Sequence, residues 1–132
     1  MVRGIITGVW DLLHAGHVLA FKEAKEHCDY LIVGLNVTPH GYKVGKNKPI
    51  ETLEERMIRL ESCKYVDEIF TYYSEEESLE KMKELNCDVR FHGDDWKDKP
   101  FTGHEMDIKN IFINRDHGYS SSSLRERIKN AI

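Results

Sequence analysis

Hydrophobic and polar positions follow two alternating periods along this chain of 132 residues. Apolar runs typical of strands occur at about 3–8, 29–36, 67–72, 88–92 and 110–114. Helical spacing of apolar positions occurs at about 15–27, 52–62, 76–86 and 122–131. Strands that alternate with helices of this length indicate βαβ units. The pattern predicts an α/β fold: one doubly wound domain over residues 1–132 with a five-stranded parallel sheet.

Polar and glycine-containing segments follow four of the predicted strands, at residues 8–17, 36–48, 93–96 and 115–122. In a doubly wound sheet, ligands bind outside the carboxyl ends of the strands, where the strand order reverses. We therefore expect these segments, distant in the sequence, to line a single cleft.

Composition narrows the class of protein. Net charge is −4, so the chain has no polycationic face and we expect no nucleic-acid partner. No apolar run approaches 18 residues and no signal pattern opens the chain, so we expect a cytoplasmic protein without a membrane partner. The three cysteines are far apart and lack C-x-x-C spacing, which favours free thiols over a disulfide framework or a zinc site.

Two histidines, His14 and His17, stand at the start of a predicted helix, after the turn that follows the first strand. They could face solvent or fill a gap in packing. A metal site is a weaker alternative, because the i,i+4 spacing and the glutamate of H-E-x-x-H are missing. The third reading is phosphate binding by both imidazoles and the helix N–H groups, with Gly16 allowing close approach.

The segment at residues 115–122 can serve the same chemistry. Gly118 permits a turn, and Ser120, Ser121 and Ser122 open the last helix, where hydroxyls and free N–H groups meet. One serine would be enough for an N-cap. Arg115 offers a planar fork for phosphate or a base carbonyl, although a surface ion pair is the alternative.

A lysine-rich segment follows the second predicted strand. Lys43, Lys46 and Lys48 lie in a stretch without an apolar anchor, which by composition is a solvated loop. Its position after a strand also allows it to close over a polyphosphate.

The first motif resembles the signature of the HIGH-type nucleotidyltransferases, G-x-[FW]-D-x-x-H-x-G-H, here Gly-Val-Trp-Asp-Leu-Leu-His-Ala-Gly-His at residues 8–17. Residues 115–122, Arg-Asp-His-Gly-Tyr-Ser-Ser-Ser, resemble the late motif of its cytidylyltransferase branch, with Asp-His in place of Thr-Glu and Tyr in place of Ile. Gly-Asp-Asp-Trp at 93–96 and Tyr-Val-Asp-Glu at 65–68 resemble elements of bacterial glycerol-3-phosphate cytidylyltransferases.

The resemblance implies a Rossmann-like fold and transfer of CMP from CTP, with Mg²⁺, to a small phosphomonoester such as glycerol 3-phosphate, in a homodimer. It implies catalytic roles for His14, His17, Lys46 and Arg115, acceptor contacts from Lys43 and Asp11, and no dedicated protein metal site. The nucleotide-binding residues it implies are Val9, Trp10, His14, Gly16, His17, Lys46, Lys64, Asp95, Arg115, Gly118, Tyr119, Ser120, Ser121 and Ser122. Asp95 or Asp11 could reach the metal, and Asp11 could equally cap the following turn.

Departures from the pattern leave alternatives open. Ser78 replaces a basic residue that the resemblance assigns to the acceptor, and Lys64 replaces an arginine. Arg56 we expect to make helix ion pairs that orient the site. The motif at 12–18 is equally similar to heptose-phosphate adenylyltransferases, so an ATP-dependent adenylyltransferase is one alternative. A non-catalytic nucleotide-binding module on the same fold is another.

Overall fold

The sheet is parallel throughout, with strand order β3-β2-β1-β4-β5. The computed structural model describes residues 1–37, 48–93 and 97–131. The strands are β1 (Arg3–Gly8), β2 (Tyr30–Asn36), β3 (Glu68–Tyr72), β4 (Val89–Gly93) and β5 (Lys109–Ile113). The helices are α1 (Ala15–Lys25), α2 (Leu53–Glu61), α3 (Glu75–Glu84) and α4 (Ser121–Asn130), with a short 3₁₀ turn η1 (Asp11–Leu13). The predicted fold is confirmed, with each predicted boundary within two residues of the observed one.

Helix starts follow local side-chain chemistry. Thr52 and Glu55 form a reciprocal capping box at the start of α2, and Ser74 caps α3 by accepting from Glu77 N. Three glutamates in the first turn of α3 suit the positive end of the helix dipole. These contacts explain why the helices begin where the sequence pattern places them.

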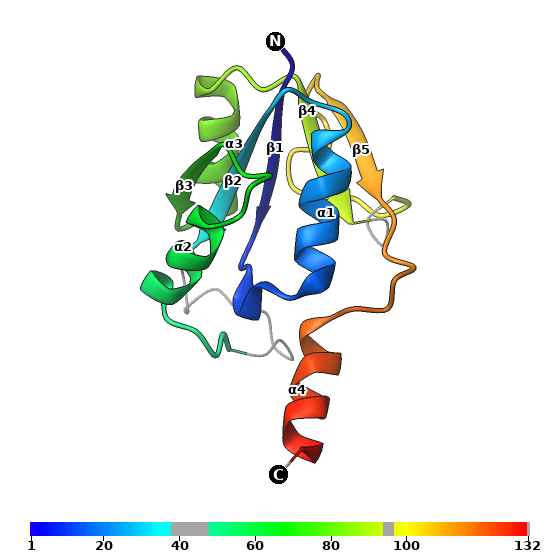
Figure 1. The fold of residues 1–132 in the computed structure, drawn as a ribbon. Helices are drawn as coiled ribbons and strands as arrows, with labels where there is room; N and C mark the ends of the chain where they lie inside the picture. Colours follow the sequence, from blue (N-terminus) through cyan, green and yellow to red (C-terminus); the bar gives the residue numbers. More distant parts are fainter. Residues whose placement is uncertain (38–47, 94–96, 132) are drawn as a thin grey trace.

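The two faces of the sheet have separate cores. Helices α1 and α2 cover one face, where Phe21 and Leu60 pack with Phe91 of β4. Helix α3 covers the other face, where Met82 packs with Ile5 and Phe70 (Figure 1). The chain leaves β1 toward β2 over the first face and returns from β3 to β4 over the second. Strand β1 is therefore the point at which strand order reverses, with its carboxyl end open to a ligand.

Helix α4 differs from the other helices because none of its residues is buried. It extends beyond the carboxyl end of the sheet (Figure 1). In the described ranges, no helix combines the length and apolar character needed to cross a bilayer. Cys28 is buried, Cys63 and Cys87 are half-buried, and all three are free thiols, as predicted.

Candidate active site

The turn after β1 is strained. Trp10 and Leu12 have φ angles of 54° and 63°, in the left-handed region that non-glycine residues seldom adopt. The buried indole of Trp10 holds this conformation by donating from Nε1 to the Gly34 carbonyl at 2.9 Å. Such strain persists only where surrounding contacts fix it. Here it directs the chain from β1 into α1 and brings the two histidines to the carboxyl end of the sheet.

A reciprocal set of hydrogen bonds fixes this turn to the residues before α2. The Asp11 carboxylate accepts from Ile50 N at 2.9 Å and from Glu51 N at 3.0 Å. Glu51 in turn accepts from Leu12 N at 2.6 Å and forms an ion pair with Arg59. Sequence analysis missed Glu51, because nothing in its local pattern distinguishes it from an ordinary residue before a helix.

Arg56 connects two strand ends. Its buried guanidinium donates from Nη1 to the carbonyl of Val9 at 3.0 Å and to that of Asn36 at 2.8 Å. The expectation of helix ion pairs for Arg56 is therefore wrong, since these hydrogen bonds go to backbone carbonyls after β1 and at the end of β2. The two hydrogen bonds do support the expectation that Arg56 orients the site, because they fix the chain where β1 and β2 end.

The two imidazoles are stacked at the start of α1. The ring centroids of His14 and His17 lie 3.7 Å apart with an interplanar angle of 25°. Trp10 meets His17 edge-on at 5.1 Å. His14 is the N-cap of α1, and its Nδ1 accepts from Gly16 N at 3.1 Å. In the neutral ring the proton is then on Nε2, which is free to donate to a ligand.

The environment keeps both imidazoles neutral. Burial, together with nearby His14 and Arg115, lowers the pKa of His17 from 6.5 to about 3. Burial and the charge of Arg115 also lower the pKa of His14. Among the described residues, nothing bonds the buried Nδ1 of His17. An orphaned buried nitrogen at a functional site is commonly satisfied by water or a ligand.

The segment at 115–118 lies against these histidines. A Cβ placed on Gly16 would lie 2.9 Å from Cε1 of His117, so the two segments are in close contact. Tyr119 stacks on His117 with centroids 5.3 Å apart, and its backbone N donates to Nδ1 of that imidazole at 2.9 Å. Gly118 has a φ of 75°, which permits the turn. Two of the segments predicted to meet are therefore adjacent.

Helix α4 begins at this junction. Ser120 is its N-cap and accepts from Ser123 N at 3.0 Å, which leaves Ser121 and Ser122 in the first turn unused by the cap. Arg125 ties the helix to the histidine turn by donating to Asp11 Oδ2 at 3.1 Å, and to the Lys48 carbonyl at 3.0 Å. Sequence analysis also missed Arg125. It lies only three residues after the serines of the late motif, and its tertiary contacts with Asp11 and Lys48 are what distinguish it.

Some predicted site residues are not brought here. Lys43, Lys46 and Asp95 lie outside the described residues. Lys64 follows α2, whose nine residues carry the chain about 13 Å from the edge where the helix begins. Asp67, three positions later, bonds to Leu31 near the amino end of β2. Within one chain Lys64 therefore lies away from this edge, and its role in nucleotide binding stays a prediction.

Asp11 does not fit either role that the sequence suggested, as an acceptor contact or a metal ligand. Its carboxylate is buried and is already used by two backbone N–H groups and Arg125. Asp11 instead holds the turn together. Within the described part of the chain, no group of three or more His, Cys, Asp or Glu residues could hold a metal ion.

Comparisons with known proteins identify the family of this chain. Residues 5–127 match the family described as cytidylyltransferase-like. This chain belongs to that family. It is thus a nucleotidyltransferase with its two histidines at the carboxyl edge of the sheet.

Individual relatives support the assignment. The chain is 31% identical to glycerol-3-phosphate cytidylyltransferase of Bacillus subtilis, over 97% of this chain and 98% of that protein. It is 32% identical to the bifunctional protein HldE of Campylobacter jejuni, over 92% of this chain but only 26% of that protein. A solved structure of a lipopolysaccharide core biosynthesis protein from Thermoplasma volcanium superposes with a TM-score of 0.72 and 26% identity, over 91% of this chain and 99% of the other.

Proposed function

We propose that this protein transfers CMP from CTP to a small phosphomonoester, such as glycerol 3-phosphate, and releases pyrophosphate. A relative that matches it along nearly its whole length carries that activity in its name. The observation that carries the proposal is the neutral, stacked pair of His14 and His17 beside Arg115 and the serines of α4.

The reaction suits a site of donors without a general base. An oxygen of the acceptor phosphate attacks the α-phosphorus of CTP, and the bond from that phosphorus to the oxygen bridging to the β-phosphate breaks. The nucleophile is already ionised near neutral pH, since its second pKa is about 6. The protein must therefore align two anions and stabilise the charge that develops between them.

The described residues divide this work. Nε2–H of His14 donates to a phosphate oxygen while its Nδ1 is held by the helix backbone. His17 offers a second neutral donor beside it. Arg115 supplies a permanent charge and a fork for phosphate or the cytosine carbonyl. We assign the shape of the nucleotide pocket to Val9, Gly16 and Tyr119. The roles of Lys43, Lys46 and Asp95, which lie outside the described residues, rest on the family resemblance alone.

We also propose that CTP brings Mg²⁺ on its phosphates, where the ion neutralises charge, rather than on a site made by Asp11. The Asp11 oxygens already accept hydrogen bonds from the backbone, so they are not available to hold the ion.

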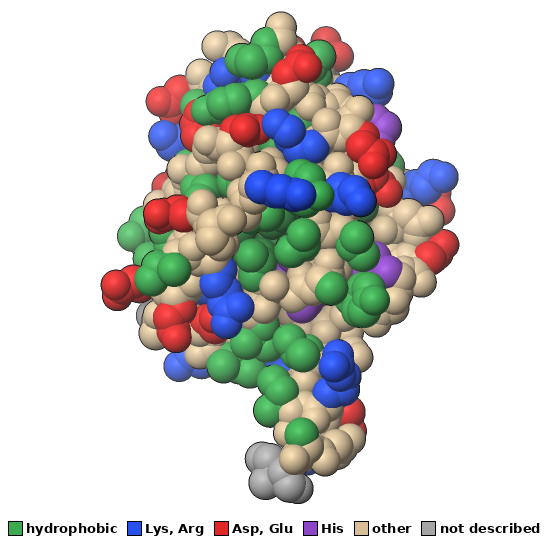
Figure 2. Space-filling view, in the orientation of Figure 1, with side chains coloured by type: hydrophobic (Ala, Val, Ile, Leu, Met, Phe, Trp, Pro, Cys, Tyr) green, Lys and Arg blue, Asp and Glu red, His purple; other side chains and the backbone are tan. Residues whose placement is uncertain are grey.

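A homodimer is a further part of the proposal. Exposed apolar residues include Leu19, Ile58 and Ile128, and hydrophobic side chains gather on one face down to α4 (Figure 2). Sedimentation showing a monomer at micromolar concentration would remove the dimer alone.

The test is a comparison of nucleotides. CTP with Mg²⁺ is expected to raise the melting temperature of the purified protein, and ATP at equal concentration to do little, because a pocket of specific polar partners rejects ligands that leave them unpaired. Pyrophosphate release is then measured with glycerol 3-phosphate and with sugar phosphates. Arg115→Lys is expected to weaken CTP binding because the charge stays and the fork is lost.

The competing functions predict other results in the same assays. Turnover with ATP and a sugar phosphate, but not with CTP, would establish an adenylyltransferase. The match to part of HldE is the observation that favours this alternative. Nucleotide binding without turnover over a panel of phosphorylated alcohols and sugars would establish a non-catalytic module.

A further inference from the structure

A buried arginine lies on the sheet face opposite the histidines. Arg90, on β4, is 8% exposed, and burial lowers the pKa of its guanidinium. Among the described residues its hydrogen bond runs from Nη1 to the carbonyl of Thr102, and the guanidinium also lies 5.3 Å from the Phe101 ring centre. No carboxylate of the described residues is within ion-pair distance of it. Glu75 and Glu105 act on the guanidinium only from beyond that distance. Burying a cation that lacks a directly paired anion is costly.

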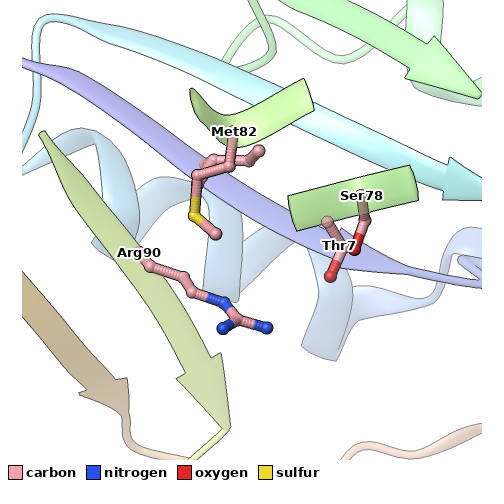
Figure 3. A pocket seen from close by; sticks show the side chains of 5 residues that line it. Thr7, Ser78, Met82 and Arg90 are labelled. Carbon is pink, nitrogen blue, oxygen red and sulfur yellow. The ribbon is translucent and has the colours of Figure 1, made fainter. Parts of the chain in front are cut away.

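The guanidinium borders a small cavity. Ile5, Thr7, Ser78, Met82 and Arg90 line this space of about 10 Å³, which is the size of one water or one phosphate oxygen. Figure 3 shows the guanidinium directed toward the hydroxyl ends of Thr7 and Ser78. The Ser78 hydroxyl already donates to the Glu75 carbonyl at 2.7 Å. No hydrogen bond within the described chain uses the Thr7 hydroxyl, which leaves it able to donate.

This cavity adjoins β1, the strand that leads into the histidine turn. Arg90 pairs in register with Ile5 of β1, and Thr7 is two positions further along the same strand. Thr7 immediately precedes Gly8, at which the histidine turn begins. The histidines lie on the α1 side of β1 and the cavity on its α3 side.

We propose that Arg90 and Thr7 form the subsite for the phosphate of the acceptor, a dianionic phosphomonoester. One phosphate oxygen takes the cavity and accepts from the guanidinium and the Thr7 hydroxyl, while the attacking oxygen faces the α-phosphorus across the end of β1. Ser78 contributes by its small size, because a longer side chain there would fill the space. The inference rests on the proposed cytidylyl transfer and adds to it the residues that select the second substrate.

Steady-state kinetics with CTP and glycerol 3-phosphate test the subsite. Arg90→Met is expected to raise KM for the acceptor about 10- to 100-fold, as for loss of a charge-assisted contact, with KM for CTP changed less than about twofold. Arg90→Lys should give an intermediate acceptor KM, because charge remains without the fork. Lys83→Met is the control: it removes the same charge from the exposed side of α3 and should change neither KM.

If Arg90→Met fails to fold, Thr7→Val still tests the subsite. It removes only the hydroxyl and should raise acceptor KM about fivefold, with Thr7→Ser restoring it. A purely structural Arg90, holding the Thr102 carbonyl, would lower the melting temperature and change both KM values together. Unchanged acceptor KM in folded Arg90→Met, or in Thr7→Val, overturns the subsite. Failure of wild-type protein to use CTP overturns the proposed function instead, and is visible before any variant is made.

Discussion

Glu51 offers a sharp test of how the histidine turn is held. Its carboxylate accepts from the backbone of Leu12, whose φ of 63° is unfavourable, and it pairs with Arg59. Removing a hydrogen bond to a charged acceptor costs about 1.5–3 kcal/mol. The pair with Arg59, whose side chain is 51% exposed, adds less than about 1 kcal/mol. We therefore expect Glu51→Ala to lower the free energy of unfolding by about 2–3 kcal/mol.

Glu51→Gln should lose only about 1 kcal/mol, because an amide oxygen still accepts from Leu12 N while the charge is gone. Catalytic activity should also depend on the conformation of this turn. If Leu12 relaxes, the imidazole of His14 moves, and a displacement near 1 Å can cost about 10²-fold. We expect kcat of Glu51→Ala to fall at least about tenfold, measured by pyrophosphate release, with urea unfolding giving the stability.

Glu54→Ala is the matched control. Glu54 has the same charge, lies three positions further along the chain and is exposed in the first turn of α2. Losing its interaction with the helix dipole should cost less than about 1 kcal/mol and leave kcat unchanged. If Glu51→Ala proves as stable as Glu54→Ala, or keeps full kcat, the reciprocal hydrogen bonds do not hold the site.

Three further predictions concern the imidazoles. Burial lowers the pKa of His17 to about 3, so between pH 6.5 and 3 the unfolded chain holds a proton that the folded chain lacks. The free energy of unfolding should therefore fall by about 2 kcal/mol from pH 6.5 to 4.5. Urea unfolding of His17→Asn should show a loss smaller by that amount. His14→Ala and His17→Ala should each lower kcat about 10²–10³-fold with folding little changed, and activity within a few-fold of wild type would contradict donor roles. Gly16→Ala should keep its melting temperature, since alanine favours helix. It should lose at least about tenfold in kcat/KM, because the added methyl meets the imidazoles of His14 and His117 at 3.0 and 2.9 Å. An unchanged kcat/KM would refute this.

The local sequence pattern was enough to predict the fold, because hydrophobic periodicity and helix capping act between residues close together in the sequence. The near-continuous apolar run of β2 indicates a strand covered on both faces, and Thr52 with Glu55 marks the start of α2. The rule that parallel strand ends share one edge then places the histidine turn and Arg115 together. Contact between Gly16 and His117 agrees with that expectation.

The sequence by itself determined the α/β class, the helix and strand positions and the two motifs to which the proposed chemistry is assigned. Only the tertiary structure decided how those motifs are supported. Glu51, Arg56 and Arg125 act on backbone groups many residues away, and Lys64 is carried from the edge by the length of α2. Partners of this kind are chosen by packing in three dimensions, for which no spacing along one chain is a signal. The cavity beside Arg90 could not be predicted from the sequence for the same reason. Its walls come from β1, α3 and β4, so it forms only when these elements pack together.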